Sequence, residues 1–232
     1  MLTSAIRRAY YSFVNRPIEP LKAILYYTAF SAFALLSPIG ATVLITYLIS
    51  MAGIDISSAI YLIYVIAAIM LFAGVLLLSG FKGAFVHSLY TGDIVKAKEY
   101  IRYSLVHLQD FLTISIIKSL LHSVVLAPTL ALYYFVLPDY LNILFLIINV
   151  PIIVLIELFF AFSYISVAQG QKPIKAITDS MNVVRLKAPD AVPAFIIYAG
   201  IYLTRAIPLF NIFSHFILYP IGYKLLIEIY KG

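Results

Sequence analysis

The chain has 232 residues, of which 63% are hydrophobic and 11% are charged, and its formal net charge is +6. Soluble domains are about 45–50% apolar and about 25% charged, so this composition excludes an ordinary soluble domain and indicates that lipid is much of the protein's solvent. Cysteine is absent, which excludes disulfides, thiolate metal sites and cysteine nucleophiles. Tryptophan is absent too, but 19 tyrosines can form the aromatic belt of a membrane interface.

The first part of the chain predicts an amphipathic helix followed by two membrane spans. Residues 1–16 carry apolar side chains at helical spacing together with arginines, which indicates a helix at the membrane surface rather than a signal peptide. Apolar runs over about 21–53 and 59–86 each exceed the ~20 residues that cross a bilayer. We expect Pro38 to kink the first run or to end it near the far interface.

The middle of the chain repeats this order. Residues 93–109 have a stripe of apolar side chains and predict a second amphipathic helix. Span three is expected over about 111–137 and contains Pro128, whereas span four is expected over about 141–168 and contains Pro151. Because a short turn joins them, these two spans should be antiparallel neighbours.

The last part of the chain follows the same order. Residues 173–187 predict a third amphipathic helix, and spans five and six are expected over about 190–207 and 209–230. Pro208 falls at the junction of these spans, and Pro220 lies inside the sixth. The sequence thus predicts an all-α polytopic membrane protein with six transmembrane helices and three interfacial amphipathic helices.

The basic residues orient these spans. They gather in alternate loops, among which the loop between spans two and three is assigned Lys82, whereas the opposite loops hold Asp55, Asp139 and a single Arg205. The positive-inside rule then places both termini and all three amphipathic helices in the cytoplasm, in a multi-pass protein of the cell membrane. Nine basic residues of these helices and their flanks are candidates for binding anionic lipid headgroups: Arg7, Arg8, Lys96, Lys98, Arg102, Lys172, Lys175, Arg185 and Lys187.

The order of the elements suggests one integral membrane domain over 1–232, built as a threefold hairpin repeat with units of about 1–90, 91–170 and 171–232. Repeats with interrupted helices are common in transporters, but membrane helices also tolerate proline for structural reasons, so both interpretations stay open. The proposed helix-kink positions fall in corresponding parts of the hairpins: Pro38, Pro128 and Pro208 near the far ends of the outward spans, and Pro151 and Pro220 within the inward spans.

Three ionisable residues fall inside spans three and four. Lys118 and His122 are four residues apart and therefore share a helical face, while Glu157 falls at a similar depth in span four. Because charges at this depth tend to pair inside a bundle, we expect Glu157 to meet Lys118 or His122 and to line a polar cavity. The alternatives are a purely structural polar bridge, or a Lys118 side chain that extends to the interface.

The sequence predicts no enzyme, cofactor or metal site. The four histidines do not have the spacing of metal ligands, and zinc-protease, serine-hydrolase and phosphate-loop motifs are absent. The stretch Tyr90-Thr91-Gly92-Asp93 lacks the first glycine of the intramembrane aspartyl peptidase motif. We find no nucleic-acid-binding motif, so the positive charge is attributed to orientation in the membrane.

The second half of the chain resembles a known family. Residues 167–180 (VAQGQKPIKAITDS) follow an apolar span and match the pattern x-Gly-x-x-Pro-x-x-Ala-(Ile/Leu)-x-x-Ser. They resemble the six-span integral membrane superfamily that includes the membrane domain of glycerophosphoryl diester phosphodiesterases and its stand-alone relatives. Tyr219-Pro220, the later Tyr230, and the stretch from Gly83 to Gly92 are similar to that family as well. The resemblance implies a six-span fold without the phosphodiesterases' soluble catalytic barrel.

These features lead to two expectations about function. The first is a non-enzymatic membrane protein that acts in membrane organisation or as an assembly subunit, with its basic cytoplasmic helices on anionic lipid. The second is a small-solute or lipid transporter with a polar site formed by spans three and four. The expected partners are membrane lipids, with a membrane protein or a second copy of the chain as further candidates, and no nucleic acid.

Overall fold

The computed structural model describes residues 2–53, 55–92, 96–135, 142–204 and 208–231. All regular elements within these ranges are helices, and none of the ranges contains a β-strand. The predicted all-α class is therefore confirmed.

The first unit is a short helix followed by two long ones, α1 (Leu2–Asn15), α2 (Ile18–Met51) and α3 (Ile56–Thr91). α1 is amphipathic as predicted, since Ala5 and Ala9 are buried on one face while the arginines of the helix are exposed. The small alanine side chains let α1 lie close against the helices beneath it.

The second unit has the same order, with α4 (Ala97–Val106), α5 (Leu108–Phe135) and α6 (Asn142–Ala168). The amphipathic helix expected over 93–109 does not run that far, because the chain leaves helical geometry at His107 and α5 begins at the next residue. The last residues assigned to the surface helix thus belong to a long apolar helix instead.

The third unit again begins with a short amphipathic helix and continues with an apolar hairpin. The elements are α7 (Pro173–Leu186), α8 (Ala188–Thr204), α9 (Pro208–Phe213), the π-helical η2 (Ser214–Leu218) and α10 (Tyr219–Lys231). In the first two units a short helix precedes two long ones, whereas in the third α8 has 17 residues and the last apolar segment is divided, so the threefold repeat stays a prediction.

Four helical segments are long and apolar enough to cross a membrane, which supports a multi-pass membrane protein. In the part of the chain with described side chains, α6 and α8 contribute only shorter apolar helices, Leu155–Ala168 and Ala188–Ile201. The structure therefore supports four of the six expected spans by length and composition: Ile18–Met51, Ala59–Thr91, Leu108–Pro128 and Phe210–Lys231.

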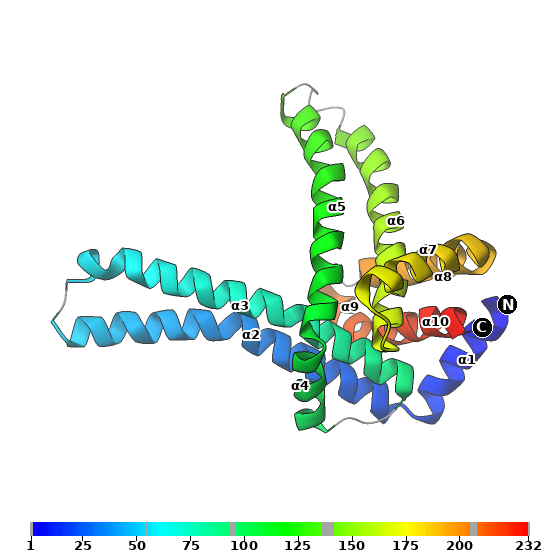
Figure 1. The fold of residues 1–232 in the computed structure, drawn as a ribbon, viewed down its shortest axis with the longest axis horizontal. Helices are drawn as coiled ribbons and strands as arrows, with labels where there is room; N and C mark the ends of the chain where they lie inside the picture. The colour runs from blue at the N-terminus through cyan, green and yellow to red at the C-terminus, as the bar shows by residue number, and fades with distance from the viewer. Residues whose placement is uncertain (1, 54, 93–95, 136–141, 205–207, 232) are drawn as a thin grey trace.

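The long hairpins do not lie parallel to one another. In Figure 1 the α2–α3 hairpin extends to the left, whereas the α5–α6 hairpin extends upward, and the two meet only at their bases. The chain termini lie close together on the opposite side of this junction, where α1 packs on α10. The expectation of one parallel six-span bundle therefore differs from this arrangement, in which hairpins diverge from a common core.

The core lies at the bases of the hairpins and is rich in aromatic rings. Phe85 of α3 stacks on Tyr219 of α10 at 5.8 Å between ring centres and meets Tyr223 edge-on at 5.6 Å. Tyr100 attaches α4 to this core, because its buried hydroxyl donates a hydrogen bond to the Phe81 carbonyl at 2.6 Å. Burial raises the pKa of the Tyr100 hydroxyl well above its usual range, which keeps it protonated as a donor.

The prolines of the outward spans do not end their helices. Pro38 is buried inside α2, and the helix continues to Met51, so the expected end near this proline is wrong. Thr42 donates its hydroxyl to the Pro38 carbonyl at 2.7 Å, one turn further along. Pro128 likewise lies inside α5, while the side chain of Pro151 in α6 lies outside the part of the structure that is described.

The predicted kink prolines of the third hairpin lie in its divided last segment. Pro208 is the first residue of α9, and residues 205–207 lie outside the described residues, so its expected kink stays a prediction. Just before Pro220, the Tyr219 N–H bonds to the Ser214 carbonyl, five residues back. This π-helical turn interrupts the regular α-helical hydrogen bonding of the last span directly before the proline.

The close approach of α2 and α3 depends on Gly74. A Cβ atom at this position would lie 2.3 Å from the Ala34 carbonyl oxygen on the facing helix. Gly40 is in the same hairpin, but a Cβ atom there would meet nothing within 4 Å. Alanine substitutions at the two glycines therefore separate the effect of helix contact from the effect of helix propensity.

We predict that Gly74→Ala lowers the free energy of unfolding by about 1–3 kcal/mol, because the added methyl group pushes α3 away from α2. Gly40→Ala should raise it by roughly 0.5–1 kcal/mol through helix propensity alone. Denaturant titration in detergent micelles measures both changes. Equal effects of the two substitutions would contradict the close contact.

Candidate functional site

The candidate site lies where α5 and α6 leave the core together. Phe111 of α5 packs into the space that Gly83 of α3 leaves open, since a Cβ atom on that glycine would lie 2.1 Å from the ring. Phe111 in turn stacks on Tyr164 of α6, with 5.9 Å between ring centres and 8° between planes. This contact fixes the register of the antiparallel α5–α6 pair.

The register brings the predicted charges together. Lys118 is seven residues, or two helical turns, after Phe111, and Glu157 is seven residues before Tyr164. Because α5 and α6 are antiparallel, these two distances place Lys118 and Glu157 at the same level along the hairpin. One turn above the stacked rings, the hydroxyls of Ser115 and Tyr164 share a short hydrogen bond.

The expected pairing of Glu157 is present. Lys118 Nζ lies 2.5 Å from Glu157 Oε1, and His122 Nε2 lies 3.8 Å from the same oxygen. The Lys118 and His122 side chains are each 18% exposed and Glu157 is 37% exposed, so the pair opens on the flank of the hairpin. A charged pair between apolar helices favours a defined register, because separating the two charges in nonpolar surroundings is costly.

A fourth residue, Lys82, belongs to this cluster. The prediction that it lies in a loop is wrong, because α3 continues to Thr91 and contains it. Its Nζ lies 4.2 Å from the centre of the Tyr164 ring, a cation–π distance, and its charge interacts with Glu157. The cluster therefore combines two lysines with one carboxylate, so it carries an excess of positive charge. The position of Lys82 inside the apolar run was the signal.

The inner ends of three helices are satisfied by side chains from other elements of the fold. At the end of α6, the Ala168 carbonyl is met by His87 Nδ1 at 3.0 Å and by the Tyr103 hydroxyl at 3.5 Å. At the end of α3, Lys224 Nζ donates to the Leu89 carbonyl at 2.9 Å and Lys231 Nζ to the Tyr90 carbonyl at 3.1 Å. Such donors satisfy terminal carbonyls and favour the negative end of the helix dipole.

The end of α10 is satisfied in the same way by Lys187, whose Nζ donates to the Ile229 and Tyr230 carbonyls at 2.9 and 3.2 Å. This half-buried lysine thus has a role in the fold that differs from the predicted headgroup contact. Arg8 bonds to Glu228 at 3.1 Å but is still largely exposed. The remaining headgroup candidates are exposed as well: Arg7, Lys96, Lys98, Arg102, Lys172, Lys175 and Arg185.

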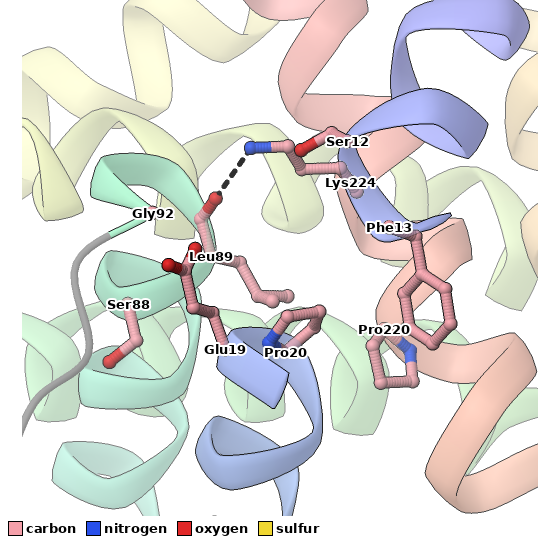
Figure 2. A pocket seen from close by; sticks show the side chains of 9 residues that line it. All are labelled: Ser12, Phe13, Glu19, Pro20, Ser88, Leu89, Gly92, Pro220 and Lys224. Atoms are coloured by element: carbon pink, nitrogen blue, oxygen red, sulfur yellow. Dashed lines mark hydrogen bonds between the residues drawn. The ribbon is translucent and has the colours of Figure 1, made fainter. Parts of the chain in front are cut away.

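A shallow, open pocket with about 20 Å³ of enclosed space lies beside the end of α3. Figure 2 shows that its wall comes from α1, the start of α2, the end of α3 and α10. It contains one acidic and one basic side chain, the hydroxyls of two serines, and apolar surface. The lining residues are Ser12, Phe13, Glu19, Pro20, Ser88, Leu89, Gly92, Pro220 and Lys224.

Within the described residues, no group of three or more histidine, aspartate or glutamate side chains is placed to hold a metal ion. No protein-family model, curated protein or solved structure matches the chain. A conclusion about function therefore rests on the structure of the chain alone.

We predict that Glu157→Gln lowers the free energy of unfolding by about 2 kcal/mol, because the Lys118 ammonium keeps its desolvation cost and loses its counter-charge. The double variant Lys118→Met/Glu157→Leu should regain most of that loss, since no unpaired charge remains. Thermal unfolding of the purified protein in detergent measures both. Additive destabilisation in the double variant would show that the two side chains do not interact.

Proposed function

We propose that the chain is a six-span protein of the cell membrane, with both termini in the cytoplasm, that works by contact with lipids or a membrane-protein partner and not by covalent chemistry. The observation that carries this proposal is the separation of apolar surface from basic surface on the molecule. Long apolar hairpins project from one junction, and the exposed basic side chains of the short helices surround that junction.

The apolar surface of the hairpins needs a nonpolar environment. Phe33 on α2 is 72% exposed, and Tyr61 and Phe72 on α3 are 80% and 66% exposed. A surface of this kind on outer hairpins is typical of contact with lipid or with another membrane protein. In Figure 1 the outer half of the α5–α6 hairpin extends away from the other helices. For the chain to cross the membrane six times, this hairpin has to turn at its base until it lies parallel to α2–α3.

The basic surface suits the inner leaflet of the membrane. Lys98 and Arg102 of α4 and Lys175 and Arg185 of α7 are exposed, and each can attract anionic headgroups by about 1 kcal/mol. Proposed membership of the six-span superfamily that includes the phosphodiesterase membrane domains agrees with this picture. The resemblance through residues 167–180 supports that membership, and it adds no catalytic role.

A second candidate function is the transport of a small solute or lipid. The Lys118–Glu157 pair favours it, because ionisable groups between apolar helices are typical of substrate and ion pathways. The adjacent Lys82 adds a further cation to the same place. Substrate movement across liposomes containing the purified chain would favour transport over the first candidate.

The proposed topology can be tested directly because the chain contains no cysteine. We expect Ser57→Cys, in the first turn of α3, to react with a membrane-impermeant maleimide on intact cells. Lys98→Cys on α4 should react only after the cells are permeabilised. Both positions are exposed, so accessibility to the reagent decides the result. Labelling of Lys98→Cys on intact cells would contradict cytoplasmic short helices.

Lipid contact can be tested with two lysines of the α7 region. We expect Lys175→Gln to reduce the retention of phosphatidylglycerol over phosphatidylcholine about fivefold, which corresponds to the ~1 kcal/mol of one exposed basic residue. Lys187→Gln makes the same charge change but removes a helix-end donor, so it should lower stability and leave lipid retention unchanged. Mass spectrometry of co-purified lipids measures the ratio. Equal lipid ratios for both variants and the wild type would refute the headgroup role.

A further inference from the structure

The pocket beside the end of α3 contains opposite charges on different helices. Glu19 is in the first turn of α2, and Lys224 is on α10. Figure 2 shows both side chains next to the last turn of α3, where Leu89 and Gly92 lie. A ligand that fits this pair must carry a cation and an anion close together.

Both charged groups retain capacity for a ligand. Lys224 has three N–H donors, of which one serves the Leu89 carbonyl at 2.9 Å, and Glu228 Oε1 is 4.0 Å away. The Glu19 carboxylate only accepts hydrogen bonds and has about four acceptor sites. Its ion pair with Arg16 is 3.9 Å long, which exceeds hydrogen-bond distance.

The rest of the wall suits a phospholipid headgroup. Ser12 brings a hydroxyl group to this space, whereas the Ser88 hydroxyl donates to the Ala84 carbonyl of its own helix. Phe13 and Leu89 supply apolar surface. The pocket lies at the inner ends of the helices, which the proposed topology places at headgroup depth.

We infer that this pocket binds a zwitterionic amino-phosphate group, the headgroup of an aminophospholipid, with its phosphate at Lys224 and its primary ammonium at Glu19. The inference rests on the proposed membrane function and names the lipid class for it. A primary ammonium can donate N–H bonds to the carboxylate, whereas a trimethylammonium cannot. A headgroup with no cation leaves the Glu19 charge uncompensated beside the phosphate.

The test uses the delipidated full chain in detergent and calorimetric titration with short-chain lipids. We expect phosphatidylethanolamine to bind at least tenfold more tightly than phosphatidylcholine or phosphatidylglycerol. Glu19→Gln should remove this preference. Glu99→Gln is the matched control, because the same change on α4 lies outside the pocket and preserves the capping contact with the Lys96 N–H. Equal affinities for the three lipids, or an unchanged preference in Glu19→Gln, would overturn the inference.

Two further arms complete the experiment. Ser12→Phe fills the pocket from the exposed α1 without changing charge. It should abolish binding, while thermal unfolding reports that the protein is folded.

Free glycerophosphoethanolamine distinguishes a lipid ligand from a soluble one. Weak competition assigns the site to a membrane lipid, and competition equal to the lipid assigns it to a soluble amino phosphate. Loss of the lipid preference in a correctly inserted protein refutes the pocket alone, whereas failed membrane insertion refutes the proposed function itself.

Discussion

The structure depends on satisfying the carbonyl groups where three helices end together. α3, α6 and α10 run toward one layer, and each leaves carbonyls there without partners in its own helix. Lysines of α10 reach the end of α3, and Lys187 reaches the end of α10. His87 and Tyr103 reach the end of α6. The bonds of Lys224, Lys231 and His87 cross between units, so these three also join the units to one another.

The candidate site follows from the same junction. Phe111 enters the space at Gly83 and stacks on Tyr164, and this contact fixes the level at which Lys118 meets Glu157 two turns further out. Ring packing at the base therefore determines charge pairing in the hairpin. The pocket beside the end of α3 is lined by Ser88 and Leu89, less than two turns beyond Lys82 and Gly83, so the inner half of α3 borders both sites.

Much of this organisation could be predicted from the sequence. Helical spacing identified the short helices and the apolar runs, and the Lys118–Glu157 pairing followed from spacing and depth alone. Lys82 was missed because a basic residue near the end of an apolar run fits a loop and a buried helix equally well. For Pro38 the sequence left a kink and a helix end open, because proline only forbids certain hydrogen bonds. Packing decides between them, and at Pro38 the helix continues to Met51.

The attachment of the α2–α3 hairpin at one end has a mechanical consequence. α2 has 34 residues, which gives a rod about 51 Å long at 1.5 Å per residue. Such a rod acts as a lever, because a rotation of about 0.1 radian at the base moves its far turn by about 5 Å. Small changes in packing around Gly83 and Phe111 are thus amplified toward the far end of the hairpin, where Asp55 caps the start of α3.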